Sequence, residues 1–318
     1  MLYVIAEDDF LVKIAAELEL AIARRAEGGG SGQLSASLLA EGNGWKVEDI
    51  ICTSGPQDRP YEEQHLQVSI AIVTAGSFQY RASPGDVSEE LMTTGSVLFG
   101  HAGQYFECAH EHGQGDRCVS FRFESDYFER MAADAGANWS SDGFGILRLP
   151  PLRGLSPLIT RVWAGVAGNI EVSWDELSIQ LAVQALQLSG RLSRVPAVVP
   201  RAAISRVTQV MRMVDRAPEA NLTLAKLSEA AGLSRYHFLR TFGRLTGVTP
   251  HQYILRTRLR EAAIRVALTE QRILDIALDS GFGDVSNFNR AFRTEYGVSP
   301  RVYRSGRNGE RRRQKAAA

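Results

Sequence analysis

Cysteine and histidine side chains gather in one short segment of this sequence. Residues 101–118 hold three of the six histidines and two of the three cysteines of the chain. On an extended strand, Cys108, His110 and His112 would point to one face, because side chains alternate with a period of two. Cysteine sulfur and histidine nitrogen are ligands that zinc and copper favour. The segment therefore suggests a metal site, an effector pocket without metal, or a redox-active thiol pair.

Whether Cys118 joins this set depends on the turn that precedes it. Residues 113–116 predict a hairpin turn. With a five-residue turn, His112 pairs with Cys118 and all the candidate ligands share a face; with a four-residue turn, His112 pairs with Arg117 and Cys118 faces away from His110. The sequence leaves both registers open. The candidate metal or effector residues are Cys108, His110, His112 and Cys118. Zinc or another transition metal is the cofactor that they suggest.

Charged residues divide the chain into two parts of opposite sign. The 318 residues include 36 Lys+Arg and 36 Asp+Glu, so the formal net charge is zero. Residues 1–200 carry 14 basic and 26 acidic side chains, a net charge of −12, whereas residues 201–318 carry 22 and 10, a net charge of +12. The length predicts two domains, and the asymmetry indicates that the C-terminal one meets a polyanion.

Composition excludes several classes of protein. The chain is 44% hydrophobic and 23% charged, which is typical of soluble globular domains. No apolar run approaches the roughly 20 residues that a membrane span needs. Glu7, Asp8 and Asp9 lie where a signal peptide would carry basic residues, and three cysteines cannot form a disulfide framework. We therefore expect a cytoplasmic protein with reduced thiols and no membrane partner.

The acidic part is expected to contain a helix and then a β domain. Residues 8–26 carry apolar side chains at helical spacing, and the glycine-rich stretch 28–32 ends the pattern. Short alternating or β-rich runs follow, and their number predicts a sandwich or small barrel. These runs are Leu34–Leu39, Trp45–Cys52, Val68–Val73, Ser77–Arg81, Gly95–Phe99, Tyr105–His110 and Cys118–Phe123.

Two further helices should follow the β domain. The first is expected at Leu155–Ala167, and the second begins after Ser173, where Glu176 would complete a capping box. The broad apolar surface of the second helix predicts either a dimer interface or internal core. Two prolines within residues 194–200 then predict a linker.

The basic part contains the same pattern twice. Residues 222–242 predict a short helix, a turn at Gly232, an N-cap at Ser234 and a second helix. Residues 272–293 repeat this arrangement with Asp284 as the N-cap. Phe238, Arg240 and Phe242 of the first unit align with Phe288, Arg290 and Phe292 of the second. This internal repeat indicates two helix-turn-helix units.

A helix at Pro250–Ala267 is expected to join the two units. At 1.5 Å per residue it would be about 27 Å long. That length suits two recognition helices in successive major grooves, which lie about 34 Å apart along one face of DNA. The spacing therefore favours a DNA-binding domain.

These residues resemble the AraC-type (AraC/XylS) transcription regulators. The resemblance covers about residues 203–304. The second unit carries it, through Ile276, Ala277, Gly281, Phe282, Phe288, Arg290, Phe292, Gly297, Pro300 and Tyr303. It implies a bacterial regulator, such as an activator that meets RNA polymerase, with recognition helices in adjacent major grooves. In many members a cupin-like β barrel binds an effector and the helices after it dimerise. Residues 33–125 and 155–194 look like that arrangement.

Outward-facing side chains on the two recognition helices are the DNA-binding candidates. They are Arg235, Tyr236, Leu239 and Arg240 on the first helix, and Ser286, Asn287, Asn289 and Arg290 on the second. Arginine can pair with guanine and asparagine with adenine, whereas leucine can touch only apolar groups such as a thymine methyl. Phosphate contacts, or ion pairs of the repeated arginines with carboxylates, are the alternatives.

The expected fold class is α+β. We expect an N-terminal helix and glycine-rich linker at 1–30, a cupin-like sensing domain at 31–150, dimerisation helices and linker at 151–200, a double helix-turn-helix domain at 201–305 and a basic tail at 306–318. The expected partners are double-stranded DNA, a small-molecule or metal effector, a second copy of the chain and RNA polymerase.

The expected function is sequence-specific transcriptional regulation without catalysis. One alternative is a metal-dependent cupin enzyme fused to a DNA-binding domain, which would need a further histidine beside His110 and His112. The other is a DNA-alkylation-repair protein, whose zinc site uses four cysteines, whereas this chain has three.

Overall fold

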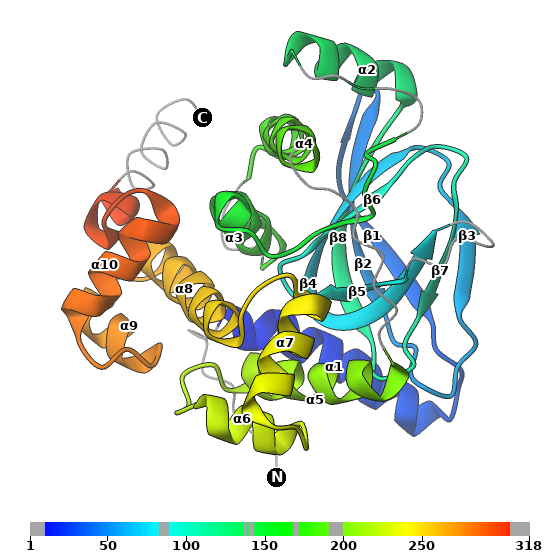
Figure 1. Ribbon diagram of the computed structural model, residues 1–318. Helices are drawn as coiled ribbons and strands as arrows, with labels where there is room; N and C mark the ends of the chain where they lie inside the picture. Colours follow the sequence, from blue (N-terminus) through cyan, green and yellow to red (C-terminus); the bar gives the residue numbers. More distant parts are fainter. Residues whose placement is uncertain are drawn as a thin grey trace.

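The computed structural model describes residues 10–82, 89–136, 139, 143–167, 172–190 and 200–305, and side chains from residue 16 onward. The predicted linker, apart from Pro200, and the predicted tail at 306–318 lie outside this part of the chain. The described residues form an antiparallel system of nine strands followed by a helical C-terminal part (Figure 1). This arrangement confirms the predicted α+β fold class.

A single long strand, β4 (Val68–Ala82), organises the β domain. β8 (Asp116–Phe123) and then β7 (Tyr105–Ala109) pair along one edge of β4, and β6 (Val97–Gly100) and then β5 (Glu89–Thr93) pair along the other. The remaining strands are β1 (Leu34–Gly42), β2 (Trp45–Cys52), β3 (Tyr61–Gln64) and β9 (Arg148–Leu149). β4 therefore belongs to both sheets of the domain.

A bulge between Val73 and Ala75 joins the two predicted strands Val68–Val73 and Ser77–Arg81 into one β4. A bulge bends its strand and changes which face the side chains take, so the sequence pattern breaks there although the strand continues. β3, β5, β9 and helix α2 (Ser125–Asp134) were absent from the prediction. The other predicted strands are confirmed, with ends that differ by a few residues.

Side chains alternate between two different environments on the central strands. On β8, Val119 and Phe121 are fully buried in a core that lies beneath the helices, whereas Cys118 and Ser120 face a cavity. β2 alternates likewise, with Val47 in the core and Cys52 at the cavity. This period of two places polar residues inside the β domain and the main core outside it.

Four helices, α1 (Phe10–Gly28), α2, α3 (Ser156–Val166) and α4 (Trp174–Ser189), contribute side chains to that outer core. Figure 1 shows where these helices lie. Leu177 and Leu181 of α4 are fully buried there, so the predicted apolar surface serves as internal core. The predicted capping box is wrong. Ser173 is the N-cap residue of α4, but its hydroxyl bonds the Asp175 carboxylate and caps no backbone N–H.

The C-terminal part is built from helices alone. They are α5 (Arg201–Arg216), α6 (Leu224–Ala230), α7 (Arg235–Thr246), α8 (Pro250–Leu268), α9 (Ile273–Asp279) and α10 (Val285–Tyr296). Residues 300–305 are also helical. α8 corresponds to the predicted linking helix and has buried side chains on most of its surface, which is typical of a helix packed between other elements. Its Ile264 joins the core of the β domain.

None of the helices in the described part of the chain combines the length and the apolar character that a membrane span needs.

Candidate nucleic-acid interface and effector cavity

The first helix-turn-helix unit is formed by α6 and α7. The Thr223 and Ser234 hydroxyls cap the two helices by accepting hydrogen bonds from the backbone N–H groups of Lys226 (3.3 Å) and His237 (3.4 Å). Gly232 lies between the helices with φ of +60°, a conformation that favours glycine. The predicted N-cap at Ser234 and turn at Gly232 are therefore confirmed.

The second unit, formed by α9 and α10, repeats this geometry. Asp284 caps α10, because its carboxylate accepts a hydrogen bond from the Asn287 backbone N–H at 2.8 Å. Gly281 has φ of +78°, and a Cβ there would lie 2.6 Å from the Glu219 carbonyl oxygen. A larger residue would therefore separate the turn from the segment that precedes α6.

Both recognition helices bury one face and expose the other. Phe238 and Phe242 of α7 lie in one core cluster, and Phe288 and Phe292 of α10 lie in another. All eight predicted DNA-binding side chains are exposed, namely Arg235, Tyr236, Leu239, Arg240, Ser286, Asn287, Asn289 and Arg290. The exposed fraction is 68% for Tyr236, so a large ring projects from α7 with little protein contact.

Three polar side chains at the start of α10 are linked to one another. The Asn287 side-chain amide donates to Asp284 (2.6 Å), and Arg290 donates to the Asn287 amide oxygen (2.5 Å). The predicted alternative of an Arg290–carboxylate pair is not what holds this arginine, since its partner here is an amide. The chain Asp284–Asn287–Arg290 presents one guanidinium edge to solvent in a fixed orientation.

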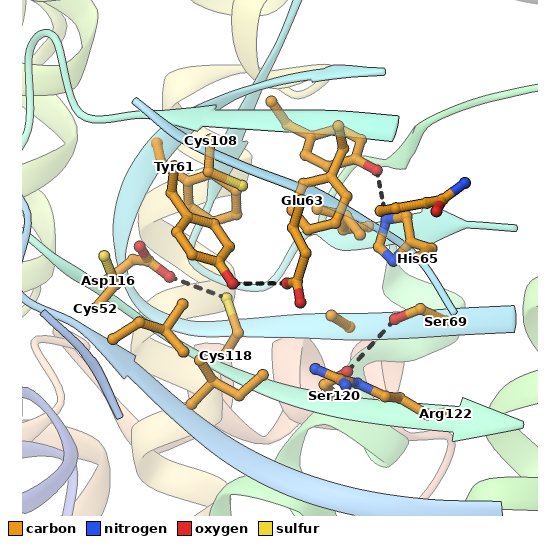
Figure 2. A pocket seen from close by; sticks show the side chains of 18 of the residues that line it. Cys52, Tyr61, Glu63, His65, Ser69, Cys108, Asp116, Cys118, Ser120 and Arg122 are labelled. Carbon is orange, nitrogen blue, oxygen red and sulfur yellow. Dashed lines mark hydrogen bonds between the residues drawn. The ribbon is translucent and has the colours of Figure 1, made fainter. Parts of the chain in front are cut away.

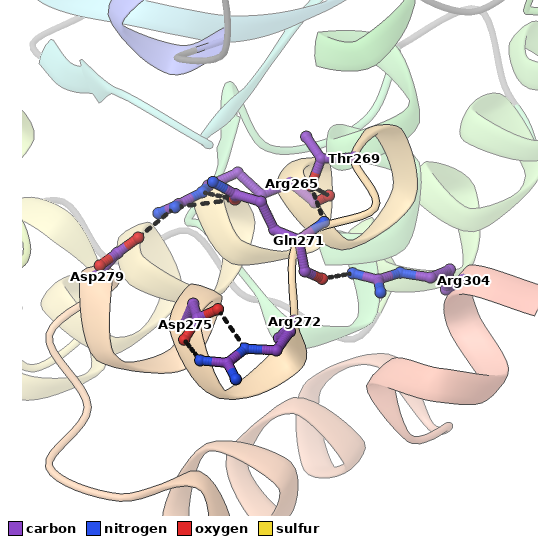
Figure 3. A network of polar contacts seen from close by, with 7 residues as sticks. All are labelled: Arg265, Thr269, Gln271, Arg272, Asp275, Asp279 and Arg304. Carbon is purple, nitrogen blue, oxygen red and sulfur yellow. Dashed lines mark hydrogen bonds and ion pairs between the residues drawn. The ribbon is translucent and has the colours of Figure 1, made fainter.

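A polar network holds the second unit against the end of α8 (Figure 3). Arg265 of α8 donates to Gln271 (3.0 Å) and pairs with Asp279 of α9 (2.5 Å). Arg304 donates to the backbone carbonyls of Val266 (3.0 Å) and Gln271 (2.8 Å). Arg304 therefore links the helical residues 300–305 to the end of α8.

The DNA-binding helices also contact the β domain directly. Tyr253 of α8 and Thr94 before β6 both donate to the partly buried Asp215 of α5, at 2.9 Å and 3.2 Å. Burial raises the pKa of Asp215 to about 6, although the hydrogen bonds and Arg260 act in the opposite direction. Arg260 lies over the Trp163 ring of α3 at 5.2 Å. Polar contacts around α8 therefore join the N-terminal part of the chain to the C-terminal part.

The ends of the recognition helices take part in the same interface. Arg148 of β9 donates to the Thr246 carbonyl at the end of α7 (3.1 Å). The hydroxyls of Thr160 of α3 and Tyr296 of α10 lie 3.0 Å apart. These contacts use the C-terminal ends of α7 and α10, whereas the candidate DNA-binding side chains nearer the N-terminal ends are exposed.

A cavity of about 380 Å³ lies inside the β domain (Figure 2). Apolar side chains such as Phe78 and Phe106 line part of it, and all three cysteines of the chain line it as well. The polar lining residues are Lys46, Tyr61, Glu63, Gln64, His65, Gln67, Ser69, Tyr80, His110, Asp116, Ser120 and Arg122. A cavity of this size, apolar with a few converging polar groups, is typical of a small-molecule site.

One side of the cavity carries hydrogen-bonding groups (Figure 2). The Tyr61 hydroxyl donates to Glu63 (2.7 Å), and burial with the Glu63 charge raises the pKa of Tyr61 to about 12. His65 Nε2 and the Tyr80 hydroxyl lie 2.9 Å apart. Burial, with Arg122 and His101 nearby, lowers the pKa of His65 to about 3, so this ring is neutral at physiological pH. A neutral imidazole here can serve as either donor or acceptor.

The predicted hairpin between residues 105–110 and 118–123 is wrong. β7 pairs with β3 and β4, whereas β8 pairs with β2 and β4, so the two strands lie end to end along β4 in different sheets. Neither of the two predicted registers exists. The segment between them is the corner where the chain passes from one sheet to the other, which a pattern of alternating residues does not reveal.

The structure brings three of the four candidate metal or effector residues together at the cavity. Cys108, His110 and Cys118 line it, as the period of two predicts for the first two. His112 does not line it, because β7 ends at Ala109 and residue 112 lies in the turn that follows. There the His112 Nε2 atom lies 3.9 Å from a carboxylate oxygen of Glu111. Burial raises the pKa of Cys108 and of Cys118, which keeps both thiols protonated.

His110 bonds to two residues that the sequence reasoning did not select. Its Nε2 lies 2.6 Å from an Asp116 carboxylate oxygen, and the other oxygen accepts from the Cys118 thiol at 3.2 Å. Burial alone would lower the pKa of His110, but hydrogen bonds to Asp116 and Cys52 raise it to about 10. The only signals in the sequence were the third cysteine at the end of a predicted strand and an aspartate two residues before Cys118.

Comparison with known proteins finds a match in the C-terminal part of the chain. A family model described as a helix-turn-helix domain matches residues 227–306. The transposon Tn10 TetD protein of Escherichia coli is 34% identical over 98 residues, which are 31% of this chain and 71% of TetD. The HTH-type transcriptional regulator MtrA of Neisseria gonorrhoeae is 33% identical over 95 residues, 30% of this chain and only 31% of MtrA.

Among solved structures, the DNA-binding domain of AdpA, a global transcriptional factor in complex with a target DNA, is 24% identical. It covers 33% of this chain and 96% of its own, with a TM-score of 0.33. The family-model match falls on the repeated helix-turn-helix units described above. By these units, the chain belongs to the AraC-type family of DNA-binding transcriptional regulators.

Proposed function

We propose that this chain is a one-component transcription regulator, in which the β-domain cavity binds an effector and α7 and α10 read DNA. The observation that carries the proposal is the pair of capped recognition helices, each with a buried phenylalanine face and an exposed polar face. The acidic β domain lies at their C-terminal ends, and phosphates would repel it. The exposed N-terminal halves are therefore the surface that fits a major groove.

The contacts around α8 support effector control of DNA binding. Thr94 and Trp163 of the N-terminal part touch Asp215 and Arg260 of the C-terminal part, and Ile264 of α8 belongs to the β-domain core. An effector acts through such contacts only if it binds the DNA-competent arrangement with a different affinity from the other arrangement. We propose a small molecule or a metal ion as the effector, and no catalytic role for the cavity.

We further propose that the regulator works in the cytoplasm as a homodimer and meets RNA polymerase at promoters. Since α4 buries its main apolar face within the chain, the dimer would use another surface than the one predicted from its leucines. Ile179 of α4 is 43% exposed and lies outside that buried face.

Replacing Arg290 with alanine is expected to weaken binding to the preferred DNA site by roughly 5- to 150-fold, equivalent to about 1–3 kcal/mol, if this arginine reads a base. The site would be selected from random-sequence DNA by the purified full-length protein, and affinity measured at fixed salt. The change should fall mainly on the selected site and little on random DNA, because base contacts specify whereas phosphate contacts position.

Arg216→Ala is the matched control, because it removes the same charge from an exposed arginine that faces Glu19 of α1 at 3.7 Å. Affinity for the selected site should then stay near that of the unmodified protein. Equal losses for Arg290→Ala on selected and random DNA would contradict base readout, and failure to select any site would contradict the proposed function.

A further inference from the structure

Three buried side chains of different chemistry converge at one end of the β-domain cavity. Each of Cys52, His110 and Asp116 offers a ligand atom, and these atoms all lie within 4.8 Å of one another. They come from three separate places in the chain: the end of β2, the residue after β7 and the start of β8. Sulfur, imidazole nitrogen and carboxylate oxygen together form a mixed set that zinc accepts.

A second sulfur lies beside this trio. Cys118 follows Asp116 by two residues on the same face of β8, and its thiol donates to the Asp116 carboxylate at 3.2 Å (Figure 2). Ligands of a tetrahedral zinc ion, at bond lengths of 2.0–2.3 Å, lie about 3.3–3.8 Å apart. The Cys118 sulfur lies outside the trio whose ligand atoms are all within 4.8 Å of one another, so the Cys118 side chain would turn toward Cys52 and His110 to complete a four-ligand set.

The backbone fixes this convergence from both sides. Gly115, with φ of +65°, lies so close to β2 that a Cβ would be 2.7 Å from the Cys52 carbonyl oxygen. Its N–H donates to the Ser54 carbonyl at 2.7 Å. A Cβ on Gly113 would likewise lie 2.7 Å from the Ser77 carbonyl oxygen. The corner between β7 and β8 thus packs closely against the end of β2 and the middle of β4, which holds His110 and Asp116 beside Cys52.

We propose that Cys52, His110, Asp116 and Cys118 bind Zn²⁺ or a divalent metal of the same coordination chemistry at the closed end of the cavity. The proposal deepens the effector role suggested for this cavity and rests on it. Binding forms two metal–sulfur bonds, one metal–nitrogen bond and one metal–oxygen bond. The two thiols and the imidazole–carboxylate pair release their protons to solvent. Of the four residues first suggested by the sequence, Cys108 and His112 are outside this set.

The same corner is connected to the DNA-binding part of the chain. Asp116 pairs with Gly76 across β4 and β8, and the Gly76 carbonyl lies 3.4 Å from the Thr94 hydroxyl. Thr94 in turn contacts Asp215 of α5. Next to His110, Glu111 pairs with Arg201 at the start of α5 at 3.3 Å. A metal ion that draws Asp116 toward Cys52 would therefore act on the corner between β7 and β8. This corner reaches α5 by two routes, through Gly76 and Thr94 to Asp215 and through Glu111 to Arg201.

Metal titration of the full-length protein tests this assignment. After removal of metal with a chelator, Zn²⁺ should bind at one equivalent per chain, and Co²⁺ should produce the absorption of a tetrahedral, thiolate-ligated ion. Cys52→Ser and Cys118→Ser should each weaken the binding of both ions by roughly tenfold or more, and so should Asp116→Asn. Circular dichroism tests whether each variant is folded. If one of them is not, His110→Gln is measured in its place.

Cys108→Ser and His112→Ala are the matched controls, since Cys108 lines the same cavity and His112 lies in the same corner. Both should bind Zn²⁺ and Co²⁺ as the unmodified protein does. Folded Cys52→Ser and Cys118→Ser proteins with unchanged metal affinity would overturn the site, as would an equal loss in Cys108→Ser. Affinity of the metal-free protein for its selected DNA site is measured in parallel. If DNA binding is intact and metal binding is absent, the metal site fails and the regulator stands; loss of DNA selection instead counts against the proposed function.

Discussion

Replacing Phe288 with alanine is expected to lower the free energy of unfolding of the second helix-turn-helix unit by about 3–5 kcal/mol, the usual cost of removing a buried aromatic ring. Phe288 is fully buried. Its ring centroid lies 5.1 Å from that of Phe282 in the turn and 5.5 Å from that of Phe292 one turn along α10. It therefore joins the recognition helix to the turn, and its loss should also abolish selective DNA binding.

Chemical denaturation of the full-length protein, followed by circular dichroism, measures this change. Thr294→Ala serves as the control, because Thr294 is exposed on the same helix and an exposed substitution usually changes stability by less than about 0.5 kcal/mol. A loss below about 1 kcal/mol for Phe288→Ala would mean that the described packing of α10 is wrong.

Replacing Asp49 with alanine is expected to lower the free energy of unfolding by about 3–5 kcal/mol, the usual cost of removing one partner of a buried ion pair. Arg117 is 3% exposed and donates two hydrogen bonds to the Asp49 carboxylate, at 2.9 Å and 2.7 Å. It also pairs with Glu17 of α1 at 2.5 Å, but the Glu17 side chain is 43% exposed, so water weakens that attraction. Asp49 is thus the more deeply buried of these two carboxylates.

The double variant Asp49→Ala/Arg117→Met separates this explanation from simple loss of packing. Removing both charges leaves no buried charge at this position, and Glu17, which also loses Arg117, is 43% exposed and can be hydrated. The double variant should therefore be more stable than Asp49→Ala alone in the same denaturation experiment. A double variant that is less stable than either single variant would show that the charges contribute little and that shape alone matters at this position.

The DNA-binding part could be predicted closely from the sequence because its signals are local. Ser234 and Asp284 are N-caps that lie directly before their helices, and Gly232 and Gly281 occupy turns with positive φ. Because the same pattern occurs twice, the prediction for each unit also supported the prediction for the other. Local propensity, turn chemistry and apolar spacing all agreed there, which is the condition under which a sequence specifies its structure.

The β domain could be predicted only in part, because its decisive features are non-local. β5 contains no alternation and forms because Leu91 packs into the core of the first helix-turn-helix unit while Met92 faces the inner core of the β domain. The corner at 110–115 separates strands that looked like a hairpin. The convergence of Cys52 with His110 and Asp116 joins residues more than fifty positions apart, which no spacing rule within residues 101–118 could show.

The central claim is that two helix-turn-helix units of one chain read DNA together, and a footprint on the selected site tests it most directly. Each bound chain of the unmodified protein should protect two stretches of one DNA face, about one helical turn apart, so that a homodimer protects two such pairs. Arg240→Ala should weaken protection of one stretch and Arg290→Ala that of the other. A single protected stretch, or two variants that weaken the same stretch, would contradict the account.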